Sequence, residues 1–329
     1  MSEIHKFLFD GLPVRGVLVR LTDAWTEILR RHASSASTAT YPGPVRQLLG
    51  EMVAAVTLMQ SSIKFNGALV LQVFGDGPVK LAVAEVQPDF GLRATATVIG
   101  AVAEDASLSE LVNLNQRGKC AITLDPKDKF PGQQAYQGVV PLSGPAHEEL
   151  GKLGTVLERF MLQSEQLETT LVLAADDGVA AGLLIQRLPL QGAGNLAGRR
   201  GGQADDERAE ADEDYRRIAV LASSLKPLEL LTLDADTILR RLFWQERLLR
   251  FESAVDDPVP HFHCGCSRQR VEKMIHGLGS AEVQSILAER GEVEVGCEFC
   301  GAHERFDAID VAQIFRGAAI LPAAGPSLH

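Results

Sequence analysis

Cysteine and aromatic side chains are scarce in this sequence, and long apolar runs are missing. Aromatic residues make up 5% of the 329 residues, and there are five cysteines. No apolar run approaches the roughly 20 residues that a transmembrane helix needs, and the opening MSEIHKFLFD lacks the apolar core and cleavage site of a secretory signal. We therefore expect a cytoplasmic protein that does not enter a membrane. Because cytoplasmic thiols stay reduced, the cysteines indicate metal binding or redox chemistry rather than a disulfide scaffold.

Positive charge is also in short supply. Lysine and arginine together number 32 against 43 aspartate and glutamate residues, which gives a net charge of −11 at pH 7. Affinity for a phosphate backbone comes mainly from lysine and arginine that release counterions, so this balance argues against a nucleic-acid partner. The sequence also contains no P-loop pattern, so it gives no sign of nucleotide use.

The length predicts more than one domain, and residues 1–190 are expected to form an α+β domain with a mainly antiparallel sheet. Its clearest signals are a long helix from Pro44 to Lys64, with apolar residues at helical spacing, and a hairpin at 67–86 around Gly75-Asp76-Gly77. Further predicted elements are helices at 22–32 and near 147–163, and strands at 14–21, 94–99, 119–124, 137–141, 169–175 and 179–188.

The chain between 191 and 256 is expected to be a flexible and helical linker. Its signals are five glycines at 191–203, seven acidic side chains at 205–214, and helical periodicity at 214–226 and 234–251 on either side of Pro227. The first part, 191–214, is predicted to be flexible and solvated. In the last helix, Leu239, Leu242 and Phe243 form an apolar face that is expected to dock on the main domain. This face would be exposed if its support failed, which makes it a candidate for binding other proteins.

Four of the five cysteines form two clusters, Cys264-Gly265-Cys266 and Cys297-Glu298-Phe299-Cys300. Four thiolates are the complete ligand set of a tetrahedral zinc site, which leaves no position for a substrate water. We therefore expect one zinc ion per chain in a small domain at 257–329. A domain of this size has too small a core to be stable without a cross-link such as a bound metal. Nearby histidines are expected to lie outside the ligand set because four thiols suffice: His261, His263 and His303. In this domain helices are predicted at 267–278, 280–291 and 306–315, and a strand at 292–295.

The same four thiols can also sense oxidants. Zinc-bound cysteine is already a thiolate, which is the form that peroxide or hypochlorite attacks. Metal binding in a small domain is folding free energy, about 10–16 kcal/mol for structural zinc in zinc-finger peptides, so oxidation that ejects the metal would unfold the domain. The short spacings favour pairing of Cys264 with Cys266 and of Cys297 with Cys300. From these residues alone, a permanent structural zinc site remains the alternative.

Two other functions are open at this point. A thiol-disulfide oxidoreductase would use the CxxC at 297–300, but the segment does not predict the thioredoxin-like setting that places such a motif at a helix N-terminus. A zinc-ribbon module would bind nucleic acid or a protein, and the acidic balance disfavours nucleic acid. The fifth cysteine, Cys120, lies in a predicted strand and is expected to be a small buried hydrophobe.

Several segments resemble the heat-shock protein 33 family of redox-regulated chaperones across nearly the whole chain. In the main domain these are RQLLGEMVAA (46–55), SSIKFNG (61–67), LQVFGDGP (71–78) and SEQ (164–166). The segment LKPLELLTL (225–233) is similar to the family's linker. Near the end of the chain, CGCSRQR, ILAERGEVEV and CEFCG are similar to the family's zinc-domain signatures. The sequence departs from the family pattern at Glu304, where an aromatic residue is frequent, and at Glu168, where proline is frequent. The stretch at 191–214 and the loop at 33–40 are also longer than usual.

The resemblance implies an ATP-independent holdase that is inactive when reduced and zinc-bound. Oxidants would release zinc, form two disulfides and destabilise the linker, and the exposed apolar surface would bind unfolding client proteins. Dimerisation would accompany activation, so a homodimer is expected. Carried over position by position, the zinc ligands and the redox switch are Cys264, Cys266, Cys297 and Cys300.

Overall fold

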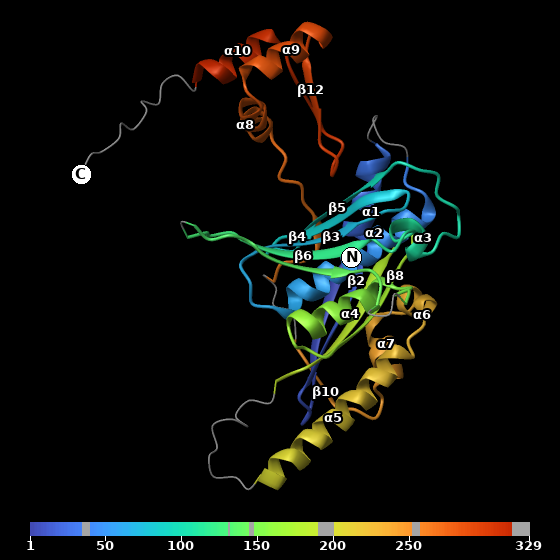
Figure 1. Cartoon of the computed structure of the whole chain (residues 1–329). Helices are drawn as coiled ribbons and strands as arrows, with labels where there is room; N and C mark the ends of the chain where they lie inside the picture. Colours follow the sequence, from blue (N-terminus) through green and yellow to red (C-terminus); the bar gives the residue numbers. More distant parts are fainter. Residues whose placement is uncertain (35–39, 131, 145–147, 190–200, 252–256, 318–329) are drawn as a thin grey trace, which may run out of the picture. The chain divides into compact units, whose positions relative to one another are not determined.

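The computed structural model describes residues 1–34, 40–130, 132–144, 148–189, 201–251 and 257–317. The chain divides into two compact units, Met1–Arg30 with Thr40–His263, and Arg31–Ala39 with Cys264–His329. Figure 1 shows the order of helices and strands along the chain. The mixed α+β fold class predicted from the sequence is confirmed, with two sheets in the first unit and the four cysteines in the second.

The first unit contains an antiparallel five-stranded sheet in the order β10-β1-β2-β9-β8. Its strands are β1 (Glu3–Phe9), β2 (Val14–Leu21), β8 (Thr169–Ala175), β9 (Ala180–Arg187) and β10 (Leu248–Arg250). Strand β9 reads AAGLLIQR and is buried along all but its last residue. A strand that is apolar on both faces needs a cover on both faces, and helices supply it here. The strands predicted at 14–21 and 169–175 are confirmed.

A second sheet of six strands has the order β11-β5-β4-β3-β6-β7. Its strands are β3 (Gly67–Phe74), β4 (Val79–Val86), β5 (Gly91–Val98), β6 (Lys119–Pro126), β7 (Tyr136–Pro141) and β11 (His261–Phe262). All pairs are antiparallel except that between β11 and β5. Alternate residues of β3, namely Leu69, Leu71 and Val73, are fully buried, as the period of two in its sequence predicts. The predicted hairpin at 67–86 is therefore confirmed.

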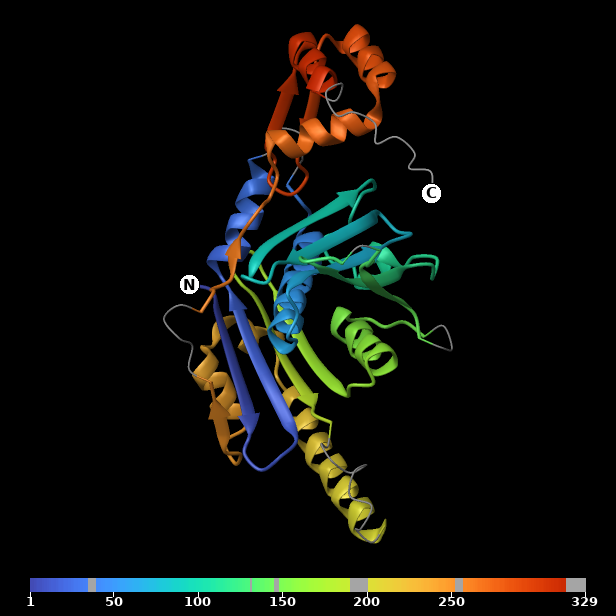
Figure 2. The same cartoon turned by 90° about the vertical axis from the view of Figure 1, so that its left-hand side faces the viewer.

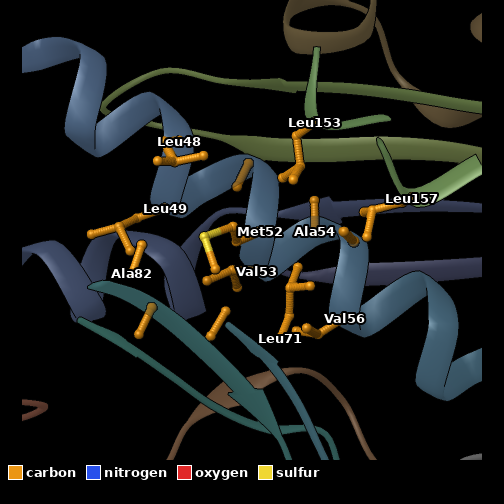
Figure 3. Close-up of a cluster of buried hydrophobic side chains, with 14 of the residues drawn as sticks. Leu48, Leu49, Met52, Val53, Ala54, Val56, Leu71, Ala82, Leu153 and Leu157 are labelled. Carbon is orange, nitrogen blue, oxygen red and sulfur yellow. The ribbon is translucent and has the colours of Figure 1, made fainter. Parts of the chain in front are cut away.

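Helix α2 (Gly43–Ser62) packs against strands of both sheets and is the centre of the main core. Figure 3 shows its side chains Leu49, Met52 and Val53 among residues of β3, β4 and α4, including Leu71 and Ala82. Every residue from Met52 to Gln60 is buried, so this part of the helix is covered on all sides, whereas its first turns keep polar residues at the surface. The remaining helices of this core are α1 (Asp23–Ala33), α3 (Leu108–Val112) and α4 (Leu153–Ser164).

The linker helices are α5 (Gly201–Ser223), α6 (Pro227–Thr232) and α7 (Ala235–Leu242). They supply buried residues to a second apolar cluster that also contains Phe7 and Phe9 of β1 and Leu183 of β9. In Figure 2 these helices, drawn in yellow to gold, lie along the sheet whose first two strands are dark blue. The linker therefore covers an apolar sheet face that would otherwise be exposed.

Three features of the linker differ from the prediction. Helix α5 begins at Gly201, so residues 201–214 are helical where a flexible stretch was expected; alanine, glutamate and arginine in ADDERAEADED favour a helix, and residues 190–200 lie outside the described part. Pro227 does lie between the two predicted helices, but it also begins a short helix that was not predicted, α6, because proline suits the first helical turn. The predicted helix at 234–251 ends at Leu242, and residues 248–250 form β10, which pairs with β1.

The second unit is small. It consists of α8 (Arg268–Leu278), α9 (Ser280–Arg290), β12 (Val293–Gly296), β13 (His303–Phe306) and α10 (Ala308–Gly317). Its buried core is formed by five residues, Ile275, Val283, Val293, Phe306 and Val311. The predicted helices at 267–278 and 280–291 are confirmed, whereas β13 was not predicted. A core of this size gives little stability by itself.

Candidate metal centre

Two turns carry the four clustered cysteines. Cys264 and Cys266 precede α8, whose N-cap residue Ser267 accepts a hydrogen bond from the Arg270 amide. Cys297 and Cys300 lie in the turn that joins the antiparallel strands β12 and β13. The fold thus brings together two segments that are about thirty residues apart in the sequence.

The four sulfur atoms all lie within 4.8 Å of one another. The Sγ atoms of Cys264 and Cys297 are 3.6 Å apart, and those of Cys266 and Cys300 are 3.3 Å apart. All four are free thiols. With zinc–sulfur distances of about 2.3 Å, a tetrahedral site has sulfur atoms about 3.8 Å apart, so both the donor set and its spacing fit a zinc ion.

Backbone and side-chain hydrogen bonds fix both turns. The amide of Gly301 donates to the Cys297 carbonyl at 2.8 Å, and the Cys297 amide donates to the Ala302 carbonyl at 2.8 Å. Gly301 has φ of +69°, a conformation that glycine adopts without strain. In the other turn, Arg270 donates from its guanidinium to the Gly265 carbonyl at 2.8 Å. This arginine was not recognised from the sequence, because only the folded turn brings that carbonyl within reach.

Without a metal ion, the protein shifts the pKa values of these thiols in different directions. Burial raises the pKa of Cys266 and also that of Cys297. Burial acts in the same direction on Cys264, but hydrogen bonds from the Cys266 amide and the neighbouring thiols outweigh it and lower the pKa of Cys264. Four thiolates this close repel one another, so a cation is needed to hold all of them in the ionised form.

The three neighbouring histidines are not part of the group that can hold a metal among the described residues. His303 Nδ1 lies 3.1 Å from a carboxylate oxygen of Glu294, and His261 Nδ1 lies 3.0 Å from the Val259 carbonyl oxygen. The ring of His263 makes an edge contact with that of His261. Each of the three rings thus has a contact other than with the thiols.

Cys120 lies far from this chemistry in strand β6. It is fully buried in the main core, and burial raises the pKa of its thiol to about 12. A thiol of this kind is inert to ordinary oxidants because almost none of it is ionised. The prediction that Cys120 is a small buried hydrophobe is confirmed.

The three candidate client-binding residues are buried in the structure. Leu239, Leu242 and Phe243 are 3%, 9% and 2% exposed. The ring of Phe243 makes an edge contact with that of Phe9, with ring centroids 5.0 Å apart, and a tilted contact with Phe7 at 6.2 Å. This apolar face is therefore occupied by the sheet in the state that the structure describes.

Known proteins resemble this chain along nearly its whole length. The family model described as Hsp33 protein matches residues 2–307 of the chain. The chain belongs to the Hsp33 protein family. A 33 kDa chaperonin of Methylobacillus flagellatus is 39% identical over 98% of this chain and 97% of its own length, and one of Chromobacterium violaceum is 41% identical over 95% and 94%.

A solved structure has the same fold. The crystal structure of a 33 kDa chaperonin, a heat shock protein 33 homologue from Thermotoga maritima, matches with a TM-score of 0.69 and covers 96% of this chain and 98% of its own. At 19% identity this likeness bears on the fold alone. Membership of the Hsp33 family supports a chaperone function, and the resemblance inferred from the sequence motifs is confirmed. Within the described residues, no helix is both long and apolar enough to cross a membrane.

Proposed function

We propose that this Hsp33 protein is an ATP-independent holdase that oxidation activates. In the reduced state Cys264, Cys266, Cys297 and Cys300 hold one zinc ion. The observation that carries this proposal is the convergence of four free thiols at the junction of two turns in a unit with a small core. When bound, zinc supplies the folding free energy that such a core lacks.

Oxidation removes the ligands. With hydrogen peroxide, a thiolate sulfur attacks one oxygen and breaks the O–O bond, giving a sulfenic acid and hydroxide. A second thiol then attacks that sulfur and releases water, so each disulfide formed consumes one peroxide, which accepts two electrons from the two thiols. We propose that Cys264 pairs with Cys266 and Cys297 with Cys300. The closest sulfur pairs of the folded unit lie across the clusters, but short loops close at the lowest entropic cost once the unit unfolds.

The client surface is proposed to be the apolar contact between the linker and the first sheet. Leu239, Leu242 and Phe243 on one side, and Phe7 and Phe9 on the other, are buried against each other. Separation of the linker would expose both sides at once, and large exposed apolar patches bind other proteins. A protein that binds unfolding clients in this way requires no nucleotide and catalyses no reaction.

The organisation of the chain follows from this scheme. We propose a chaperone core at 1–190, a redox-responsive linker at 191–256 and a zinc-binding switch at 257–329. The active form is proposed to be a homodimer in the cytoplasm, without nucleic-acid partners because of the net charge of −11.

The thiol-disulfide oxidoreductase alternative finds less support. Its CxxC lies in the turn of the β12–β13 hairpin and not at a helix N-terminus, where the helix dipole would lower the pKa of the first thiol. Burial raises the pKa of Cys297 instead.

Light scattering from a thermally unfolding client tests the proposal. The chain is added either reduced and zinc-loaded, or after peroxide at mildly raised temperature, and peptide mapping by mass spectrometry identifies the disulfides. We expect suppression of aggregation by the oxidised sample alone. No suppression by either sample would refute the holdase, and insulin reduction by the reduced sample would favour the oxidoreductase.

A further inference from the structure

Arg268 is the first residue of α8 and follows Cys266 by two positions. Its guanidinium donates to the Arg305 carbonyl at 2.9 Å and to a Glu304 carboxylate oxygen at 3.3 Å. The same group also donates to an Asp310 carboxylate oxygen at 2.8 Å. Its Cζ atom lies 4.1 Å from the centroid of the buried Phe306 ring, which is the geometry of a cation–π contact.

The partners of Arg268 lie in the segment that carries Cys297 and Cys300. Glu304, Arg305 and Phe306 are in β13, which pairs with β12, and the turn between these strands contains Cys297 and Cys300. Asp310 belongs to α10, which follows β13. Arg268 therefore joins the segment that carries the first two thiols to the segment that carries the last two, through contacts that involve no metal.

We propose that Arg268 is a positioning residue for the four-cysteine centre, which holds the two ligand-bearing segments together and thereby sets how firmly the metal is retained. The inference rests on the proposed metal site and adds a residue that controls it. A site whose ligands are already gathered loses less conformational freedom when the metal binds, so it binds more tightly. Oxidant or chelator then acts on a centre that opens less frequently.

The residue type suits this role. A guanidinium is planar, stays charged and presents several donors in a fixed fork, while its face stacks on an aromatic ring. Lysine has one point charge and cannot make all of these contacts together. The Arg268 side chain is 42% exposed and Asp310 is 37% exposed, so solvent screens part of the interaction. Residues that support metal ligands typically change metal affinity by 10- to 100-fold, and this exposure argues for the lower end, about tenfold.

The test uses the reduced full-length chain and cobalt(II), whose absorption bands report thiolate ligands and their geometry. Arg268→Met is compared with the wild-type chain and with Arg268→Lys. Arg290→Met is the matched control, because Arg290 lies in the last turn of α9 and is exposed. Affinity is measured by competition with a chelator, and release is followed after the chelator is added in excess.

We expect Arg268→Met to keep its thiolate-to-cobalt band, to bind about tenfold more weakly and to release the metal faster. Its ligand-field bands should also shift, which a residue that only stabilises the fold would not cause. Arg268→Lys should recover part of the affinity, and Arg290→Met should match the wild type.

Unchanged affinity, release and band positions in Arg268→Met would overturn the inference while leaving the proposed function intact. A wild-type chain that does not bind cobalt or zinc would instead overturn the proposed function, and this inference with it. If Arg268→Met does not fold with metal present, the same measurements on Asp310→Asn test the inference instead. That substitution removes the negative charge that pairs with Arg268 and keeps an acceptor oxygen. A several-fold loss of affinity in that variant supports the inference, and none refutes it.

Discussion

Arg20 connects the core to the linker and offers a direct way to loosen the linker without oxidation. From strand β2 it donates to the carbonyl of Leu230 at 2.6 Å and to that of Leu231 at 3.2 Å, in the last turn of α6. A cation at the carboxyl end of a helix also interacts favourably with the helix dipole. The side chain is 14% exposed, so solvent screens these contacts little.

Arg20→Met would remove both hydrogen bonds to α6. A hydrogen bond to a charged group contributes about 1.5–3 kcal/mol, and two bonds from one guanidinium are not fully additive. We expect Arg20→Met to weaken docking of α6 by about 2–3 kcal/mol. Since 1.4 kcal/mol is a factor of ten, the undocked population should rise about 30- to 150-fold. Docking of the apolar face on α7 should weaken with it.

Amide hydrogen exchange in the reduced, zinc-loaded chain measures this change directly. Exchange of the Leu230 and Leu233 amides, which donate within α6, should accelerate by the same factor, and the reduced variant should suppress some client aggregation. The control is Arg46→Met, which loses bonds to Asp177 and to the Tyr41 carbonyl but does not touch the linker. Unchanged exchange in α6 of a folded Arg20→Met chain would refute the reasoning.

Three further results are expected. Removal of zinc by a chelator under reducing conditions should abolish exchange protection in α8 to α10 and leave that of the central strands β2 and β9 in place; retained protection in those helices would mean that their core suffices. Phe243→Ser should lower holding by the oxidised chain without changing zinc affinity, and equal holding would remove Phe243 from the client surface. Burial raises the pKa of Glu51 to about 7 in the folded chain, above its unfolded value of about 4.3. The folded chain therefore has its full stability below pH 4.3, where Glu51 is protonated in both states, and loses stability as the pH rises through 7 and the buried carboxyl group has to ionise. Urea unfolding of Glu51→Gln should therefore show up to about 3 kcal/mol more stability than the wild type at pH 8 and little difference at pH 4; equal stability at both pH values would contradict this assignment.

The elements that could be predicted from the sequence are those whose signals are local. Helix α2 and the hairpin of β3 and β4 have periodicities within one segment, and the four cysteines have ligand spacings that few other structures require. Each of these patterns can be recognised without knowing which distant residues it contacts in the fold. Burial of Cys120 was predicted in the same local way, because a lone cysteine in a strand is most frequently a small buried hydrophobe.

The features that were missed depend on distant partners. The segment at 248–250 continues an apolar, arginine-rich pattern that favours a helix, yet it forms β10 because β1, some 240 residues earlier, offers a free edge. The contacts of Arg20 with α6 and of Arg268 with β13 are equally non-local. A lone arginine in a sequence indicates a charged surface position, and only the fold shows which carbonyl or carboxylate it reaches.

The path from the cysteines to the linker runs through two short edge strands. After β10 completes the edge of the first sheet, the chain continues to β11, which completes the edge of the second sheet beside β5. The His263 amide donates to the Leu92 carbonyl at 2.9 Å, and the next residue is Cys264. Strands of two and three residues at sheet edges have few hydrogen bonds and open at low free-energy cost. Under the proposed function, unfolding that begins at the thiols would reach β11 first and β10 next, and loss of β10 would remove an edge strand from the sheet that the linker helices cover.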